Sequence, residues 1–265
     1  LDTPWGAPSA PVIECEYKEQ SFFFLPRHGI GHSIPPSKIN YRANIDAFKK
    51  LGVTDILSLS SVGSLNEDLS PGVFVVINQY VDFTKNRITT FFDDDIVVHV
   101  SMATPTDERL MEISRACLEK LDIKHNFGGS YICIEGPQFS TKEESRLFQK
   151  WGCDVIGMTS MPEAKLCREA SLRYVNIGMV TDFDCWHPDH ENVEVSNVIS
   201  TLKGNTEYAK KFILEFLLDY SKSTIKNKLN SYDSLVTAKN KIKKETAYKF
   251  KNIMPDLHKD FTKNN

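Results

Sequence analysis

The stretch from Arg173 to His187 (RYVNIGMVTDFDCWH) constrains the fold of this chain more than any other. Its first half, Tyr174 to Val180, is mostly apolar and β-branched, which is typical of a buried strand in an α/β sheet. From Thr181 onward the side chains change to hydroxyl, carboxylate and aromatic groups. Ligands of open α/β sheets bind beyond the carboxyl ends of the strands, so this polar end is a candidate site. An acidic loop that caps the next helix is the alternative interpretation.

Predicted strands and helices alternate along the first 220 residues, which favours a three-layer α/β domain with a central mixed sheet flanked by helices. The predicted strands are 12–17, 21–25, 53–60, 73–81, 130–134, 154–158 and 174–180, of which the first two form a hairpin. The predicted helices are 40–50, 106–121, 140–151, 162–170 and 196–218. Ser140 and Glu143 form a capping-box pattern. Residues 221–265 are rich in lysine and poor in apolar residues, which predicts a solvated tail that can contain helix, rather than a binding arm.

Composition excludes several classes of protein. A formal net charge of -3 lacks the clustered positive charge of a nucleic-acid-binding domain. No apolar run is long enough to span a bilayer, and no secretory leader is recognisable. The six cysteines form no C-x-x-C pair, so we expect a reduced, cytoplasmic protein without disulfides.

Four predicted strands end in polar residues, and the ends of parallel strands lie along one edge of a sheet. Three of these ends offer a cation, an imidazole and hydroxyl groups, which suit an oxyanion such as phosphate. The fourth offers carboxylates, which would repel phosphate but suit the amine and ring nitrogens of a base. Ordinary turn chemistry explains each pair of residues taken alone. The four ends are Arg27–His28, Ser60–Ser61, Met158–Ser160 and Thr181–Asp184.

The sequence HPDH, from His187 to His190, has a spacing that metal ligands can use. Pro188 and the lack of a matching third ligand favour a solvated loop, so no metal site is predicted.

Taken together, these segments resemble the purine nucleoside phosphorylase superfamily and, within it, the S-methyl-5'-thioadenosine phosphorylase family. The matching motifs follow the family's order over nearly all of residues 1–218. They are TPWGAPS (3–9), RHGIGH (27–32), PSKINYRANI (36–45), SVGSL (61–65), MATP (102–105), IEGPQFS (134–140), WGCDVIGMTSMPEA (151–164) and VTDFDCW (180–186).

The resemblance implies phosphorolysis of 5'-methylthioadenosine to adenine and 5-methylthioribose 1-phosphate, a reaction of purine and methionine salvage. By similarity, Asp182 supplies a proton or hydrogen bond to the purine N7, and Asp184 holds the exocyclic amine. A carboxyl group donates only when it is protonated, so we expect a raised pKa at Asp182. Relatives that prefer 6-oxopurines use Asn in this region, so the Asp pair favours 6-aminopurines.

The same resemblance implies the rest of the site. The phosphate would be held by Arg27, His28, Ser60, Ser61 and Thr159. The nucleoside would contact Met158 under the ribose, Phe139 against the purine, Thr181, and a methylthio pocket of His32, Val195, Val198 and Ile199. His99 matches a residue that the family contributes from a neighbouring subunit, which implies a homotrimer. No metal or organic cofactor is implied.

Two departures from the family pattern matter. Family members begin with a strand and a Gly-rich turn that contacts phosphate, whereas this chain begins at Leu1 without such a turn. We therefore expect an N-terminally incomplete domain that lacks its first strand. Gly157 stands before Met158, where some members have Asn, which leaves the ribose contacts open. The alternative functions are a phosphorylase of adenosine or inosine, a hydrolase, or an inactive nucleoside-binding fragment.

Overall fold

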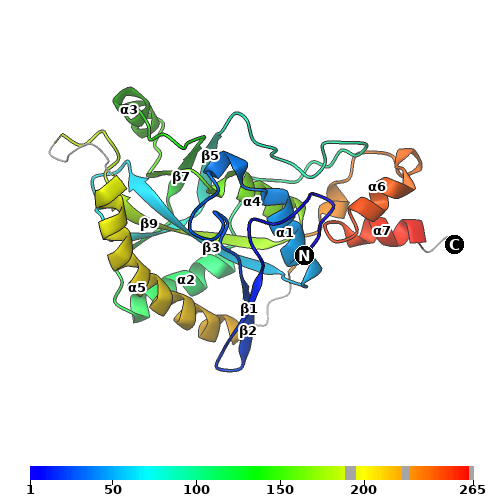
Figure 1. Cartoon of the computed structure of the whole chain (residues 1–265), viewed down its shortest axis with the longest axis horizontal. Coiled ribbons are helices and arrows are strands. Elements are labelled where there is room, and N and C mark those ends of the chain that lie inside the picture. Colours follow the sequence, from blue (N-terminus) through cyan, green and yellow to red (C-terminus); the bar gives the residue numbers. More distant parts are fainter. Residues whose placement is uncertain (189–194, 223–226, 263–265) are drawn as a thin grey trace.

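The computed structural model describes residues 1–188, 195–222 and 227–262; the side chains of 195–200, 202 and 203 are outside this description. The predicted α/β fold is confirmed, because a mixed sheet lies between layers of helices (Figure 1). Within the described residues the sheet has seven strands. Their order is β5 (Gln79–Phe83), β7 (Ser130–Ile134), β8 (Val155–Gly157), β3 (Asp55–Ser64), β9 (Arg173–Asp182), β4 (Phe74–Ile77) and β6 (His125–Phe127).

The two long central strands, β3 and β9, are parallel and pair along their whole length, from Asp55 with Arg173 to Gly63 with Asp182. β9 is buried from Arg173 to Thr181, and half of its residues are large and apolar: Tyr174, Val175, Ile177, Met179 and Val180. Apolar side chains on both sides of the strand are expected where helices cover both faces of a sheet. This pairing brings the polar ends of β3 and β9 together.

Helices cover both faces of the sheet (Figure 1). On one face, α1 (Tyr41–Lys50) and α4 (Ser160–Glu169) contribute to a core that includes Ile45 and Leu166. On the other face, α2 (Glu108–Lys120) and α5 (Val195–Ser221) pack through Leu110 and Phe212. The short helix α3 (Lys142–Lys150) packs through Phe148 near β7 and β8.

The hairpin predicted near the start of the chain is confirmed. Strands β1 (Ile13–Tyr17) and β2 (Gln20–Phe24) pair antiparallel, and Lys18 and Glu19 turn the chain with positive φ angles of 46° and 65°. The hairpin forms a sheet of its own, separate from the seven-stranded sheet. A 3₁₀ turn (Pro36–Lys38) then leads into α1, whose N-cap is Asn40.

The structure differs from the prediction at three places. The single strand expected over 73–81 is two strands, β4 and β5, because the chain changes position in the sheet at Asn78. The edge strand β6 was not predicted, since three residues carry too little pattern. The capping box is formed by Thr141 and Glu144, one residue later than expected, because the Ser140 hydroxyl donates to Asp184 instead.

The Lys-rich stretch contains helix, as the prediction allowed, but it is less solvated than expected. It contains two 3₁₀ turns (Ser231–Ser234 and Lys239–Lys241) and the helices α6 (Lys244–Lys249) and α7 (Pro255–Thr262). Apolar residues spaced between the exposed lysines are buried and join the core beside α1 and α4: Ile242, Ala247, Phe250, Ile253, Met254 and Leu257. The prediction of a solvated tail relied on the number of lysines and did not consider the spacing of the apolar residues between them.

Candidate active site

A cavity of about 1000 Å³ opens at the polar ends of the central strands. The chain reaches it from β3, β8 and β9, from the loop after β2, and from the loop after β7. Most of the predicted site residues line it: Arg27, His28, His32, Ser60, Ser61, Phe139, Met158, Thr159, Thr181, Asp182 and Asp184. His99 does not line this cavity, and the side chains of Val195, Val198 and Ile199 lie outside the described part of the chain.

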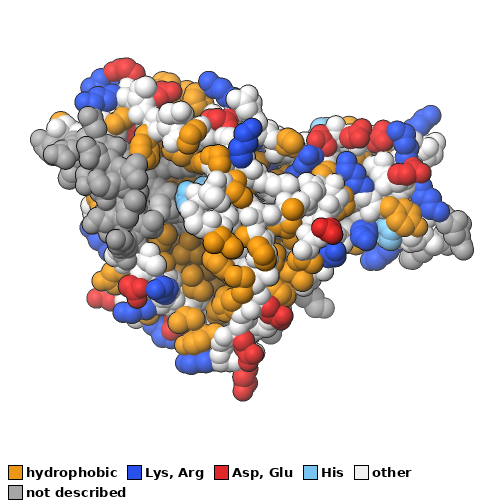
Figure 2. Space-filling model, viewed as in Figure 1, with side chains coloured by type: hydrophobic (Ala, Val, Ile, Leu, Met, Phe, Trp, Pro, Cys, Tyr) orange, Lys and Arg blue, Asp and Glu red, His pale blue; other side chains and the backbone are white. Residues whose placement is uncertain are grey.

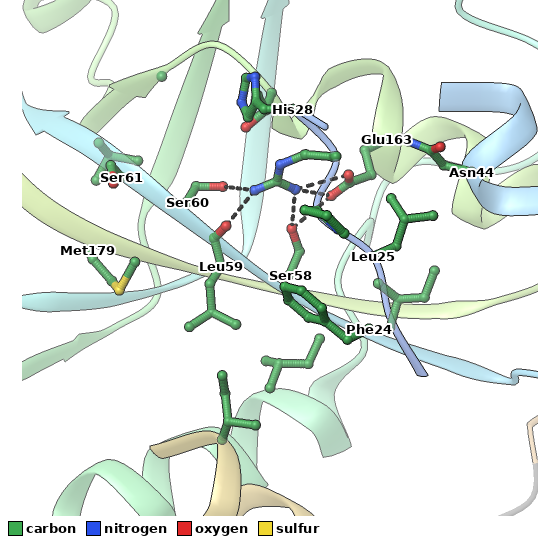
Figure 3. A pocket seen from close by; sticks show the side chains of 18 of the residues that line it. Phe24, Leu25, His28, Asn44, Ser58, Leu59, Ser60, Ser61, Glu163 and Met179 are labelled. Atoms are coloured by element: carbon green, nitrogen blue, oxygen red, sulfur yellow. Dashed lines mark hydrogen bonds and ion pairs between the residues drawn. The ribbon is translucent and has the colours of Figure 1, made fainter. Parts of the chain in front are cut away.

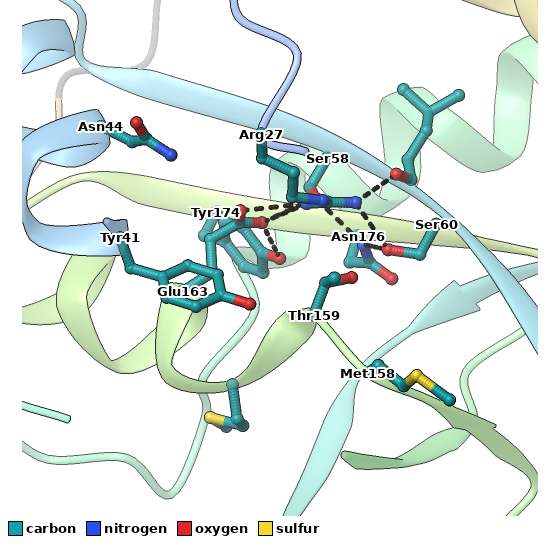
Figure 4. Close-up of polar contacts among 12 residues, drawn as sticks. Arg27, Tyr41, Asn44, Ser58, Ser60, Met158, Thr159, Glu163, Tyr174 and Asn176 are labelled. Carbon is teal, nitrogen blue, oxygen red and sulfur yellow. Dashed lines mark hydrogen bonds and ion pairs between the residues drawn. The ribbon is translucent and has the colours of Figure 1, made fainter. Parts of the chain in front are cut away.

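Arg27 lies at the cationic end of the cavity, where its guanidinium group is held from several sides (Figure 4). Its Nη1 donates to both carboxylate oxygens of Glu163, at 2.8 and 2.9 Å, and to the Ser58 hydroxyl at 2.7 Å. Its Nη2 donates to the Leu59 carbonyl and, at 2.9 Å, to the Ser60 hydroxyl. The cation therefore has a fixed position beside the middle of β3, as the labelled Ser58, Leu59, Ser60 and Glu163 in Figure 3 also show. The strand predicted to end at Ser60 continues to Ser64, because its ladder with β9 extends to Gly63.

His28 adds an imidazole beside this cation. Its ring stacks on that of His32, with centroids 4.0 Å apart, and its Nδ1 lies 2.9 Å from the Ile34 carbonyl. Burial lowers the pKa of His28, and the nearby His32 and Arg27 act in the same direction. A neutral His28 donates Nδ1–H to Ile34, because a carbonyl only accepts, and this leaves Nε2 available to a ligand.

Hydroxyl groups complete this end of the site. Ser60 is buried, and its oxygen accepts from Arg27 and, at 3.0 Å, from Asn176. Ser61 is exposed to the cavity. Thr159 is buried at the N-cap of α4, where its backbone N–H donates to the Tyr131 hydroxyl at 3.3 Å. One fixed positive charge and several hydroxyl groups thus converge beside the middle of β3 and the end of β8.

The acidic end is formed by Asp182 and Asp184 at the end of β9. The Asp182 carboxylate accepts from the Thr181 hydroxyl at 2.7 Å and from the Asp184 backbone N–H at 2.8 Å. Burial raises the pKa of Asp182, and the charge of Asp184 adds to the increase. The direction agrees with the expectation from the sequence. Two carboxyl groups in unlike environments can serve as a proton donor and an acceptor.

Asp184 is buried and held in a left-handed conformation, with φ of 49°. The Ser140 hydroxyl donates to its Oδ2 at 2.6 Å. Gly63 on β3 allows this close approach, because a Cβ there would lie 3.0 Å from Asp182 Oδ1 and 3.4 Å from Asp184 Cβ. The position of the acid pair therefore depends on a residue of the neighbouring strand.

Sequence reasoning missed Glu163, which balances the charge of Arg27. Glu163 is buried on α4 and also accepts from the Ser58 and Tyr174 hydroxyl groups at 2.7 and 2.8 Å. In the sequence, Glu163 looks like an ordinary acidic residue of the first turn of α4, where a negative charge is favourable near the helix N-terminus. Only its position beside a strand-end arginine could have suggested the pairing.

Sequence reasoning also missed Arg87, whose side chain is only 1% exposed. It donates to the carbonyl oxygens of Ile134 and Glu135 after β7, at 3.2 and 2.7 Å. It also donates to the carbonyl oxygens of Met158 and Met161, which follow β8, at 2.7 and 2.6 Å. Arg87 lies in the irregular segment between β5 and α2, and it ties together the two segments that carry Phe139 and Met158.

Tyr131 explains the glycine at position 157. A Cβ at Gly157 would lie 2.1 Å from the Tyr131 hydroxyl and 2.7 Å from its Cζ. The tyrosine is fully buried on β7, next to β8. Its ring thus occupies the space that a side chain at position 157 would need.

Among the described residues, no three or more His, Cys, Asp or Glu side chains are grouped as metal ligands would be. In the same part of the chain, every helix is too short or too polar to cross a membrane.

The fold and the two-ended site define a class of protein, and the comparison with known proteins agrees. The family model of the phosphorylase superfamily matches residues 1–218. The chain therefore belongs to this superfamily.

Its relatives narrow the class to the S-methyl-5'-thioadenosine phosphorylases, as the sequence motifs indicated. The enzyme of this name from Rhodospirillum rubrum is 51% identical over 213 residues, which are 80% of this chain and 72% of that protein. A crystal structure of a methylthioadenosine phosphorylase from an Antarctic soil metagenomic library superposes with a TM-score of 0.92, at 40% identity, over 96% of this chain and 91% of the other. A variant of the adenosine/methylthioadenosine phosphorylase from Schistosoma mansoni, in complex with methylthioadenosine, superposes with a TM-score of 0.81 at 37% identity, over 84% of each chain.

Proposed function

We propose that this chain catalyses phosphorolysis of 5'-methylthioadenosine, releasing adenine and 5-methylthioribose 1-phosphate in purine and methionine salvage. One observation carries the proposal: a single cavity has a fixed cation with hydroxyl groups at one end and, at the other, the half-buried carboxyl group of Asp182, whose pKa is raised by its surroundings. The reaction requires phosphate on one side of C1' and a base that leaves on the other. The names of the relatives support the choice of substrate.

At the cationic end, phosphate would contact Arg27, His28, Ser60, Ser61 and Thr159. Glu163 orients the guanidinium through the carboxylate pair at 2.8 and 2.9 Å, so that little positional freedom remains to be lost. Charge-assisted hydrogen bonds from an arginine are well suited to a phosphate oxygen. His28 Nε2 would meet a protonated phosphate oxygen, because the neutral ring accepts at this atom.

At the acidic end, Asp182 would hold a proton against N7 of the purine. Cleavage of the glycosidic bond leaves an oxocarbenium-like ribosyl centre and places negative charge on the base. A proton or hydrogen bond from Asp182 would neutralise that charge. Positioned proton transfer of this kind contributes about 10²–10⁴-fold to the rate. Asp184, fixed by Ser140, would accept from the exocyclic amine of adenine.

The remaining predicted contacts surround the nucleoside. Phe139 is 43% exposed at the cavity and offers an aromatic face to the purine. Met158 would pack under the ribose and Thr181 would support Asp182. His32, Val195, Val198 and Ile199 would form the apolar pocket of the methylthio group. The reaction needs no metal or organic cofactor in this scheme.

We also infer a cytoplasmic homotrimer, in which His99 completes the site of a neighbouring subunit. His99 is exposed, and its backbone N–H donates to the Ser234 carbonyl at 3.0 Å. Sedimentation should give a trimer. His99→Ala should raise KM for the nucleoside without changing the sedimentation coefficient.

The decisive experiment measures adenine release from 5'-methylthioadenosine with and without inorganic phosphate. Phosphate-dependent release and formation of 5-methylthioribose 1-phosphate support the proposal. Equal rates without phosphate indicate a hydrolase. Adenine binding without turnover indicates a nucleoside-binding protein.

A second candidate is a phosphorylase of adenosine or inosine, which the name of the Schistosoma mansoni enzyme favours for adenosine. The ratios of kcat/KM for methylthioadenosine, adenosine and inosine separate these activities. A preference for inosine would contradict the role given to Asp184.

A further inference from the structure

Buried hydrogen bonds connect the two central strands behind the cationic end of the cavity. In the ladder of β3 and β9, Asn176 is paired with Ser58, and its side chain is fully buried. Its Nδ2 donates to the Ser58 hydroxyl at 3.1 Å and to the Ser60 hydroxyl at 3.0 Å (Figure 4). Ser58 and Ser60 line the cavity, so Asn176 acts on two cavity residues from within the core.

Glu163 fixes the direction of these hydrogen bonds. The Ser58 hydroxyl lies 2.7 Å from Oε1 of Glu163, which is paired with Arg27, and a carboxylate only accepts. Ser58 therefore donates its single hydrogen to Glu163, and its oxygen can only accept from Asn176. This requirement places the NH₂ group of the amide, rather than its oxygen, against β3. Asn176 Oδ1 has no hydrogen-bond partner in the described part of the protein, so the N–H groups alone hold the amide. The hollow beside α5 and the hairpin in Figure 2 lies outside this network.

The same bonds leave the Ser60 hydroxyl with a single remaining role. A hydroxyl group has one hydrogen to donate and two lone pairs that accept. Arg27 Nη2, at 2.9 Å, and Asn176 Nδ2, at 3.0 Å, occupy both lone pairs of the Ser60 oxygen. No acceptor among the described residues is bonded to the Ser60 hydrogen. The Ser60 hydroxyl can therefore donate to a ligand in the cavity but cannot accept from one.

We propose that Asn176 is a positioning residue for phosphate, which makes the Ser60 hydroxyl an obligate hydrogen-bond donor to the anion. This inference rests on the proposed phosphate site. Without the amide, Ser60 would keep one free lone pair and could rotate until that lone pair faced the anion. With the amide, the donating orientation is set before phosphate arrives, so little rotational freedom is lost on binding. An amide that only stabilised the sheet would not affect the affinity for phosphate.

Titration calorimetry of the full chain with inorganic phosphate tests this role. Asn176→Leu keeps the approximate volume of the side chain and removes both N–H donors. The Kd for phosphate should rise by about tenfold or more, because a hydrogen bond to a charged ligand is misdirected. In a Ser60→Ala background the same substitution should change Kd by less than about twofold, since the hydroxyl that transmits the effect is absent. The KM for the nucleoside should stay within about twofold of the parent value.

Asn205→Leu is the matched control. Asn205 is also a buried asparagine, but its Nδ2 donates to the Val180 carbonyl, at 3.1 Å, rather than to a hydroxyl group. This substitution should lower Tm, as Asn176→Leu does, and leave the Kd for phosphate unchanged.

Asn176→Asp is a second variant that keeps the shape of the amide if Asn176→Leu does not fold. Its carboxylate only accepts, so it should take the Ser60 hydrogen away from phosphate. Repulsion between this carboxylate and phosphate acts equally in a Ser60→Ala background. The part of the loss of affinity that disappears in that background therefore reports the Ser60 hydrogen bond.

Three outcomes would overturn the positioning role of Asn176 alone. They are an unchanged Kd in the variants at position 176, the same fold-change with serine and with alanine at position 60, and an equal rise of Kd in Asn205→Leu. The last outcome would assign the effect to a general loss of packing. Failure of the parent chain to bind phosphate would instead overturn the proposed function together with this inference, so the two failures are distinguishable.

Discussion

Both carboxylate oxygens of Glu163 lie against Nη1 of Arg27, at 2.8 and 2.9 Å, so the cation expected to bind phosphate already has a buried counter-charge. The partners come from the loop after β2 and from α4, which are 136 residues apart. The pair fixes the direction of the guanidinium before any ligand arrives. It also means that a phosphate must share Arg27 with a carboxylate. Substitution of Glu163 therefore tests whether phosphate binds at Arg27.

Glu163→Gln should leave Arg27, whose side chain is 16% exposed, without its counter-charge. Breaking a fully buried pair typically costs about 3–5 kcal/mol of stability, and the partial exposure of Arg27 should make the loss smaller. Inorganic phosphate should recover part of the loss, because its charge replaces that of the carboxylate. The shift of Tm on adding phosphate should therefore be larger in the variant than in the parent chain.

Glu169→Gln is the matched control, since Glu169 is a buried carboxyl on the same helix that bonds to Thr90 and Phe91 rather than to Arg27. Its phosphate-induced Tm shift should equal that of the parent. Equal shifts in all three proteins would contradict phosphate binding at Arg27.

Asp182→Asn should change the preference between nucleosides. An amide can donate to N7 without being protonated, but it no longer transfers a proton to the base. We expect kcat/KM for methylthioadenosine to fall by about 10²-fold or more, and the inosine-to-methylthioadenosine ratio of kcat/KM to rise. Asp122→Asn, at an exposed position with φ of 53°, should leave the ratio unchanged. An unchanged ratio in Asp182→Asn would count against base recognition by this carboxyl.

Glu169 should make stability depend on pH. Burial raises its pKa to about 7, although Thr90 and Phe91 donate hydrogen bonds that lower it. Between its ordinary value of 4.5 and about 7 the folded state binds more protons than the unfolded state, so the free energy of unfolding should fall as pH rises through this window. Urea unfolding at several pH values should give this slope, and Glu169→Gln should flatten it. A slope that Glu169→Gln leaves intact would contradict the assignment.

Gly157→Ala should force Tyr131 to move, because the new Cβ would lie 2.1 Å from its hydroxyl. Overpacking of this kind costs about 1–3 kcal/mol. The double variant Gly157→Ala with Tyr131→Leu should show a favourable coupling energy in a double-mutant cycle. Gly204→Ala, with open space on α5, should instead stabilise by roughly 0.5–1 kcal/mol. Additive effects of the substitutions at 157 and 131 would disprove the steric explanation.

Arg87→Lys should weaken nucleoside binding without changing phosphate binding. Lysine cannot reproduce the fork that reaches the carbonyls after β7 and β8, so the segments carrying Phe139 and Met158 should lose their relative position. KM for the nucleoside should rise while KM for phosphate stays within about twofold, since Arg87 does not touch Arg27 or Ser60. Arg115→Lys, exposed on α2, serves as control. Equal changes in both KM values would indicate a general loss of folding instead.

Local patterns in the sequence were sufficient wherever one segment carried the information. The apolar run of β9 and its abrupt polar end predicted a buried strand and a site. The alternation of strands and helices predicted the α/β class. The break at Asn78 was missed because β4 and β5 are both apolar, and a strand pattern does not record which neighbours a strand pairs with.

The sequence by itself determined the residue types at the strand ends: a cation and hydroxyl groups after three strands, and carboxyl groups after the fourth. It determined the family as well, through motifs spread over residues 1–218. Only the tertiary structure decided that Glu163 neutralises Arg27 and that Arg87 joins the ends of β7 and β8. These relations depend on contacts between segments far apart in the chain. Burial sets their strength, because a charge or a backbone group removed from water must find its partner within the fold.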